Sequence, residues 1–244
     1  MAEMRQLHIY DCALMDKLPM RVFLATMVVA GSFAVALIVV IPAYGEPETC
    51  PGICDRIPNT AWIDQHAVPL DAVYHWPALA GQAAHTTGAA PGPRFRFEEL
   101  CGAPALPQDP RDSAVVARST VAHPDGQWQL QAQVLHWRGD TAHGGAVAAT
   151  VFGNAVAALR GCQQRAPQES PSLTSDEPTR MAAVISGPVV MHTYLLAHPA
   201  SSTISELTLW SSAPPQTPWP AMADDPVLGA MNASLCEAYI ASCP

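Results

Sequence analysis

Residues 128–134 read Trp-Gln-Leu-Gln-Ala-Gln-Val, a strict alternation of apolar side chains and glutamines. Such period-two alternation is typical of a β-strand with one buried face and one solvent-facing face. The segment Val115–Ala122 before it is β-branched and apolar, and the turn His-Pro-Asp-Gly at 123–126 separates the two. In that turn the proline fixes φ and the glycine permits a positive φ. The sequence therefore predicts a β-hairpin here.

Two helices and three further strands are predicted downstream of this hairpin. Ala142–Cys162 contains no proline and carries apolar side chains at helical spacing. Residues 163–179 hold three prolines among polar residues, which indicates a surface loop. The last helix begins at Asp224-Asp225-Pro226, because an acidic cap precedes a proline at the first helical position. The three strands are predicted at Met181–Ser186, Val189–Ala197 and Thr203–Trp210.

This order of elements, β-β-α-β-β-β-α, predicts an α+β domain over residues 113–244. We expect an antiparallel sheet with helices packed on one face. Residues 45–112 hold many prolines and glycines, and we interpret them as a loop-rich approach to that domain. Within them the sequence indicates a short helix near Asp71–Leu79 and a short strand at Phe95–Phe97.

The run Val22–Ile41 is twenty consecutive residues without a charge. At a rise of about 1.5 Å per residue it spans about 30 Å as a helix, which matches the hydrocarbon core of a bilayer. We therefore expect one N-terminal transmembrane helix. The chain divides into a cytoplasmic tail (1–21), a transmembrane signal-anchor (22–44), the proline-rich segment (45–112) and the extracytoplasmic domain (113–244).

Charges around the apolar run indicate its orientation. Lys17 and Arg21 precede it, whereas Glu46 and Glu48 follow it, which places the N-terminus in the cytoplasm and the C-terminal domain outside the cell membrane. The alternative is a cleaved signal peptide, since residues 43–45 place small residues at the −3 and −1 positions. The apolar run exceeds the roughly 7–15 residues of a signal-peptide core, which favours a retained anchor.

The seven cysteines agree with this topology. Cys12 is alone on the inner side, where thiols stay reduced. The six cysteines on the outer side are an even number, which predicts three disulfides. Their pairing is left open. If the last helix continued through both Cys236 and Cys243, these two residues would lie about 10 Å apart, which is too far for them to bond each other. This constraint does not apply if the helix ends earlier. The outer six are Cys50, Cys54, Cys101, Cys162, Cys236 and Cys243.

Composition excludes some classes of partner. The formal net charge is −9, and the excess of acids lies in the outer part of the chain. An acidic ectodomain argues against binding nucleic acid or an anionic membrane surface. Lys17 is the single lysine in a chain rich in arginine, alanine and proline, which is typical of a GC-rich genome and suggests an actinobacterial source.

Motifs for catalysis, metals and cofactors are absent from the sequence. There are no Walker, dinucleotide, kinase or zinc-protease signatures, so we expect no enzyme activity, no cofactor and no metal. His136 and His192 lie in strands and would form a metal pair if they met across the sheet, although satisfied or solvated histidines explain them better. Cys50 and Cys54 are one residue too widely spaced for a thioredoxin-type motif, which favours a structural staple.

Tryptophans are the surface-chemistry candidates. Trp137 stands at the opposite parity to the buried stripe of its strand, and Trp210 does so relative to Leu207 and Leu209. Exposed aromatic residues at strand ends favour contact with a ligand or partner, so Trp137 and Trp210 are the predicted binding residues. Alternatively, the tryptophans form a second small core beneath the N-terminal loops.

The arrangement over Ser113–Pro244 resembles the extracytoplasmic sensor-type domains of mycobacterial cell-envelope proteins, including those attached to membrane serine/threonine kinases and related lipoproteins. The resemblance is carried by the glutamine-patterned strand, the helix ending at Cys162, and paired strands before a cysteine-bearing final helix. No kinase domain precedes the apolar run here, and the inner tail is short. The resemblance implies a binding or sensing domain with no catalytic residues to carry over.

We therefore expect a single-pass, integral membrane protein whose disulfide-stabilised ectodomain binds an envelope ligand or a membrane-protein partner. Two alternatives remain open. One is an envelope enzyme, either a thiol oxidoreductase at Cys50 and Cys54 or a hydrolase; the other is an accessory subunit of a membrane complex.

Overall fold

The computed structural model describes residues 55–88, 90–212, 214–239 and 242–243, all within one compact unit, Pro47–Pro244. The predicted tail and membrane helix lie outside the described residues, as do Cys12, Cys50 and Cys54.

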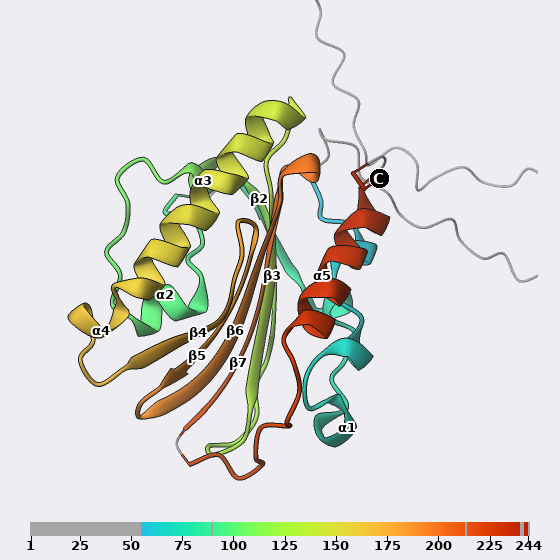
Figure 1. Ribbon diagram of the computed structural model, residues 1–244. Coiled ribbons are helices and arrows are strands. Elements are labelled where there is room, and N and C mark those ends of the chain that lie inside the picture. The colour runs from blue at the N-terminus through green and yellow to red at the C-terminus, as the bar shows by residue number, and fades with distance from the viewer. Residues whose placement is uncertain (1–54, 89, 213, 240–241, 244) are drawn as a thin grey trace, which may run out of the picture. The chain divides into compact units, whose positions relative to one another are not determined.

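A seven-stranded antiparallel sheet forms the centre of this unit, in the order β1-β2-β3-β7-β6-β5-β4 (Figure 1). The predicted hairpin is confirmed as β2 and β3, with Ala117 opposite Val134. The other three predicted strands are also confirmed, as β5, β6 and β7. The strands are β1 (Ala84–Thr87), β2 (Val115–Val121), β3 (Gln129–His136), β4 (Ser170–Asp176), β5 (Arg180–Ser186), β6 (Val189–His198) and β7 (Thr203–Ser212).

Both long predicted helices are present. The carboxylate of Asp140 accepts a hydrogen bond of 3.0 Å from the backbone N–H of Ala142 and so caps the first of them. Pro226 stands in the first turn of the last helix, where its missing N–H costs no hydrogen bond. The helices are α1 (Asp71–Tyr74), α2 (Arg96–Leu100), α3 (Thr141–Arg160), α4 (Cys162–Arg165) and α5 (Asp225–Ala238).

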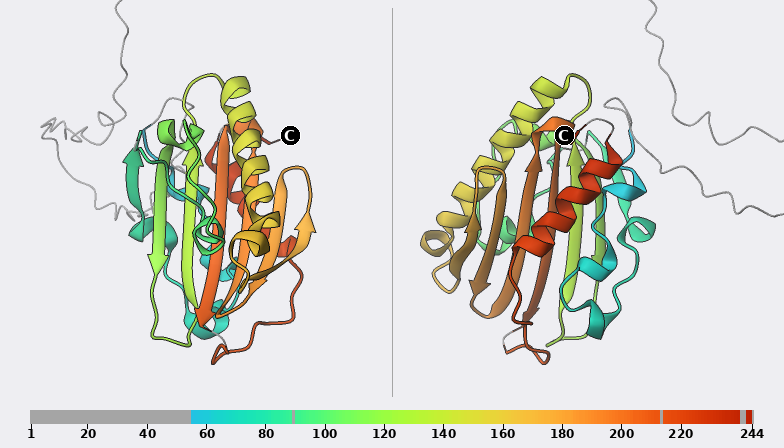
Figure 2. Two further views of the ribbon diagram at one scale, coloured as in Figure 1. Left: turned by 90° about the vertical axis from the view of Figure 1, so that its left-hand side faces the viewer. Right: turned by 45° about the vertical axis from the view of Figure 1, so that its right-hand side comes forward.

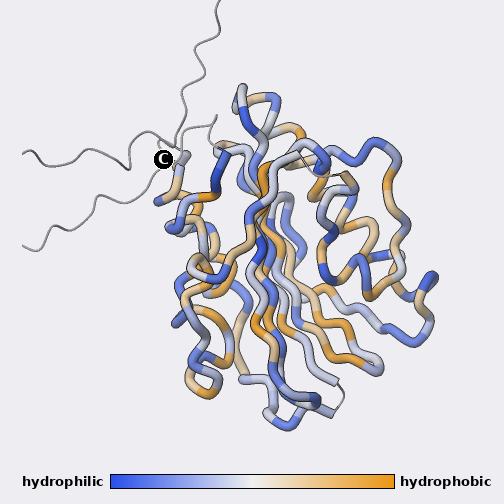
Figure 3. The backbone as a smooth tube through the Cα atoms, turned by 180° about the vertical axis from the view of Figure 1, so that it is seen from behind, coloured by the Kyte–Doolittle hydropathy of each residue, from blue (hydrophilic) through white to orange (hydrophobic). Residues whose placement is uncertain are grey.

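Helices cover both faces of the sheet, which corrects the expectation of helices on one face only. The α3 helix packs on one face and α5 on the other, and the N-terminal segment, residues 55–83, lies beside α5 (Figures 1 and 2). The reason is that the central strands are apolar on both sides: on β6, Leu195 belongs to the core under α3 and Leu196 to the core under α5. In Figure 3 the hydrophobic colour accordingly recurs along the central strands. A strand with two apolar faces needs cover on both.

Among the described helices, α3 is the one that is long and apolar enough to cross a membrane by length and composition. It lies against the sheet, where its residues Val151, Phe152 and Leu159 are buried. Its apolar side is therefore explained by the core of this domain.

The glutamine side of β3, predicted to face solvent, is buried as well. Gln133 is fully buried and Gln131 nearly so. The segment leading into α2 covers this side, since the Gln133 amide donates to the backbone carbonyl of Arg94 at 3.2 Å. The alternation of residue types is thus real, but it separates an apolar buried face from a polar buried face.

Two local predictions were wrong. Phe95–Phe97 is not a strand: α2 begins at Arg96, and the Glu98 carboxylate accepts a 2.9 Å hydrogen bond from the N–H of Phe95 at the helix start. The tract 163–179 is more than a surface loop, because it contains most of α4 and the whole of β4. As an edge strand of the sheet, β4 tolerates Pro171, whose missing N–H breaks no central ladder.

The four outer cysteines that the structure describes form two disulfides. Cys101 at the end of α2 bonds Cys162 at the start of α4, and both are fully buried. Cys236 in α5 bonds Cys243, with Cα atoms 5.3 Å apart. The helix ends at Ala238, so the distance that a continuous helix would impose on Cys236 and Cys243 does not apply.

Candidate functional site

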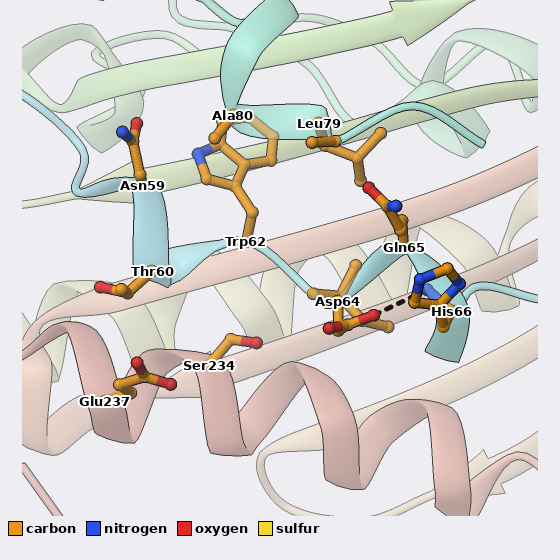
Figure 4. A pocket seen from close by; sticks show the side chains of 12 residues that line it. Asn59, Thr60, Trp62, Asp64, Gln65, His66, Leu79, Ala80, Ser234 and Glu237 are labelled. Atoms are coloured by element: carbon orange, nitrogen blue, oxygen red, sulfur yellow. Dashed lines mark hydrogen bonds between the residues drawn. The ribbon is translucent and has the colours of Figure 1, made fainter. Parts of the chain in front are cut away.

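A groove of about 390 Å³ lies between α5 and the N-terminal segment that packs beside it (Figure 4). Ser234 and Glu237 line it from α5, while Asn59, Trp62 and Gln65 line it from the N-terminal segment. Its walls are therefore far apart in sequence and meet only because both pack on the same face of the sheet.

Core packing and short turns fix the N-terminal wall. Trp62 and Ile63 are buried in the same core as α5. Between the lining residues, the Asp64 carboxylate accepts a 2.8 Å hydrogen bond from the N–H of His66 and so starts a short 3-10 turn, Gln65–Ala67. The backbone of this wall is thus fixed by the buried Trp62 and Ile63 and by one turn that Asp64 caps.

One donor in this wall has no partner. The indole N–H of Trp62 lacks a hydrogen-bond acceptor within the part of the chain that the structure describes, although its residue is only 6% exposed. The other three buried tryptophans are satisfied: Trp76 by the carbonyl of Pro69, Trp128 by that of Thr217 and Trp137 by that of Pro110, at 2.8–2.9 Å. Leaving a buried donor unsatisfied costs about 1–3 kcal/mol. An acceptor brought by a ligand would recover that cost.

The groove carries acidic and amide groups. The carboxylates of Asp64 and Glu237 stand on opposite walls, and Figure 4 shows the indole nitrogen of Trp62 on the side of its ring toward Asn59. His66 also lines the groove; its Nδ1 lies 2.9 Å from Asp71 Oδ2, and this hydrogen bond raises the pKa of His66. The arrangement accepts hydrogen bonds at two carboxylates and donates one from the indole, and it repels anions.

A second polar group is buried on the opposite face of the sheet. Arg118, Gln133 and Glu206 lie side by side on β2, β3 and β7. Arg118 donates to Gln133 Oε1 at 2.9 Å, and Gln133 Nε2 donates to Glu206 Oε2 at 2.7 Å. Glu206 Oε1 accepts from the N–H of Arg96 at 2.7 Å. Burial raises the pKa of Glu206 to about 7, although the hydrogen bond from Arg96 opposes the rise.

The predicted binding tryptophans do not form a site together. Trp137 is buried in the core under α3, because that face of the sheet is covered too, so its predicted exposure was wrong. Trp210 is partly buried, and the Arg96 guanidinium lies 4.8 Å from its ring centre. The two stand at opposite ends of the β3–β7 pair: Gln129 faces Trp210, and His136 next to Trp137 faces Thr203. Trp62 and Trp76 are buried, but in the core that the N-terminal loops share with the sheet and α5 and not in a separate small core.

The histidines also group differently from the sequence hypothesis. His192 pairs with Leu209 near one end of the sheet and stacks on Trp219, whereas His136 lies at the other end, opposite Thr203. They do not meet. His198 instead lies beside the Cys236–Cys243 pair, with its Nε2 3.4 Å from Cys243 Sγ. The spacing of histidines in the sequence does not predict this combination, because its residues come from a strand end, a helix and the chain after that helix.

No protein-family model matches the sequence, and comparisons with curated proteins and with solved structures find no match.

Proposed function

We propose that this chain is a single-pass membrane protein whose extracytoplasmic domain binds a small, hydroxyl-rich envelope ligand in the groove between α5 and the N-terminal segment. The observation that carries the proposal is the buried, unsatisfied indole N–H of Trp62 in the wall of that groove. Natural proteins satisfy most buried donors, so an unsatisfied one beside a groove needs an explanation, and an acceptor supplied by a ligand is the explanation that we propose.

The ligand class follows from the lining. The carboxylates of Asp64 and Glu237 accept hydrogen bonds from hydroxyl groups, and the amides of Asn59 and Gln65 both donate and accept. The Trp62 indole requires an acceptor, which a hydroxyl or an acetamido carbonyl supplies. A saccharide offers donors and acceptors together without the negative charge that the two carboxylates would repel.

Binding is tested with N-acetylglucosamine oligomers added to the full chain in detergent, followed by calorimetry. Trp62→Phe keeps an aromatic ring in the core and removes the donor. We expect it to weaken binding about tenfold, because one hydrogen bond in a desolvated site contributes about 1.5 kcal/mol.

Trp76→Phe is the matched control. Trp76 is buried in the same core, but its N–H already donates to the carbonyl of Pro69 at 2.8 Å. This variant loses stability and keeps its affinity for the saccharide. Equal affinity in wild type and Trp62→Phe would contradict the proposal, and so would an absence of binding by wild type.

The same preparation separates binding from catalysis. We propose a binding protein rather than an enzyme, since the groove combines hydrogen-bonding groups with no nucleophile held by a base among its lining residues. Turnover of the oligomers that disappears in Glu237→Gln would assign a hydrolase instead.

A further inference from the structure

Three metal-binding side chains converge where β6 and α5 end. The ligand atoms of His198, Cys236 and Cys243 all lie within 4.8 Å of one another. They come from three separate places: the last residue of β6, the last turn of α5, and the chain after α5. The fold therefore assembles the cluster, and local sequence spacing does not.

His198 is held with one nitrogen toward the sulfurs. Its Nδ1 lies 2.7 Å from the hydroxyl oxygen of Ser201, and that hydroxyl is also 3.2 Å from the His198 carbonyl. When the hydroxyl donates to the carbonyl, Nδ1–H donates to the hydroxyl, and Nε2 keeps its lone pair toward Cys243. Metal-binding histidines are oriented in this way by a partner on the other ring nitrogen.

The two disulfides differ in access. Cys101 and Cys162 are fully buried, whereas Cys236 and Cys243 are both partly exposed. A reductant in solution therefore reaches Cys236–Cys243 first, because thiol–disulfide exchange requires in-line access to a sulfur.

The distances suit a tetrahedral site. A Zn²⁺ with Zn–S bonds of about 2.3 Å and a Zn–N bond of about 2.1 Å separates sulfur from nitrogen by about 3.6 Å. The contact between His198 Nε2 and Cys243 Sγ is already 3.4 Å. The two sulfurs must separate from about 2.0 Å in a disulfide to about 3.8 Å around the metal, a movement within reach of side-chain rotation.

We propose that Cys236, Cys243 and His198 form a redox-gated site for Zn²⁺ or a similar soft divalent cation. A dithiol reductant transfers two electrons and two protons to the disulfide, which becomes two cysteine thiols. The dithiol itself is oxidised to a disulfide. Zn²⁺ then binds both sulfurs and His198 Nε2 and displaces the two thiol protons to solvent. The fourth position is open to water, as in zinc sites with three protein ligands.

The test uses the full chain with Cys12, Cys50 and Cys54 changed to serine, so that no other accessible thiol binds metal. The protein is treated with a phosphine reductant, freed of it and titrated with Co²⁺, whose thiolate charge-transfer absorption reports sulfur ligation. We expect one Co²⁺ per chain in the reduced protein and none in the oxidised protein, with Zn²⁺ displacing the Co²⁺.

The variants distinguish this site from adventitious binding to two thiols. His198→Gln should weaken Co²⁺ binding at least tenfold, and His198→Cys should restore it with a stronger charge-transfer band. Ser201→Ala keeps all three ligands and should weaken binding to a smaller extent. Absence of the thiolate band in the reduced protein overturns the proposal, as does equal affinity in wild type and His198→Gln.

Discussion

Glu206 should make the stability of this domain depend on pH in a direction opposite to that of carboxylates whose pKa is lowered by an ion pair. In the unfolded chain its pKa is 4.5, and burial raises the pKa to about 7 in the folded protein. Below pH 4.5 both states are protonated, and the contribution to stability is complete. As the pH rises from 4.5 to about 7, the unfolded chain releases its proton first, so stability falls. At about 1.4 kcal/mol per pH unit, the loss is roughly 3 kcal/mol.

His192 acts in the opposite direction over nearly the same range. Burial lowers the pKa of His192 from 6.5 to about 4, with Asp224 opposing the change. Its contribution is complete above pH 6.5 and is lost as the pH falls from 6.5 to about 4. Because the two effects are similar in size, the contributions of Glu206 and His192 should largely cancel between pH 4.5 and 6.5.

Two variants separate these effects. Glu206→Gln removes the titration while keeping a polar side chain for Gln133 and Arg96. Relative to wild type, this variant should gain roughly 3 kcal/mol as the pH rises from 4.5 to 7. His192→Phe keeps a ring stacked on Trp219 and removes the opposing titration, so its stability should fall over that range.

The assay is urea unfolding of the full chain in detergent, with disulfides intact and tryptophan fluorescence as the signal, repeated across that pH range. The slope with pH is the informative quantity, because any change in hydrogen bonding adds a constant offset. If the difference between wild type and Glu206→Gln does not change with pH, the hydrogen bonds to the carboxylate compensate fully for burial, and the reasoning is refuted.

Two further predictions concern packing and charge. Gly145→Ala should lower the unfolding free energy by about 1–3 kcal/mol, because the added Cβ would lie 2.5 Å from the backbone oxygen of Pro199. Gly153→Ala on the same helix should raise the unfolding free energy by about 0.5–1 kcal/mol, since nothing lies within 4 Å of the added Cβ. Urea unfolding measures both. Arg111→Met should lower the unfolding free energy by about 3–5 kcal/mol, since the substitution leaves the buried carboxylate of Glu98 without its partner at 2.6 Å. A loss below 1 kcal/mol would show that solvent reaches this ion pair.

Much of the sheet was predictable because its signals are local. The alternation at 128–134 and the turn before it define the β2–β3 hairpin without reference to the rest of the chain. The cap at Asp140 likewise begins α3. Parity along a strand, however, says which side chains share a face and not what covers that face. Gln133 and Trp137 were assigned to solvent for this reason, although α2 and α3 cover them.

The groove was beyond sequence reasoning for a related cause. Its walls, near Trp62 and near Ser234, share no local sequence pattern. They meet only because α5 and the N-terminal segment pack on the same face of the sheet. The unsatisfied state of the Trp62 indole is a property of three-dimensional surroundings. No spacing of residue types in the chain signals it.

The order of strands also has a consequence for how the chain folds. The central pair joins β3 to β7, and the contact between Gln133 and Glu206 spans 73 positions. The strands β4 to β7 form a continuous meander that can assemble from neighbours in sequence, whereas β3 has no second partner until β7 exists. During synthesis from the N-terminus, β3 therefore keeps one edge without a strand partner for as long as the following half is unmade. The three glutamines of β3 make one face of this half-paired strand polar, so the alternating stretch exposes less apolar surface than an all-apolar strand would before β7 is added.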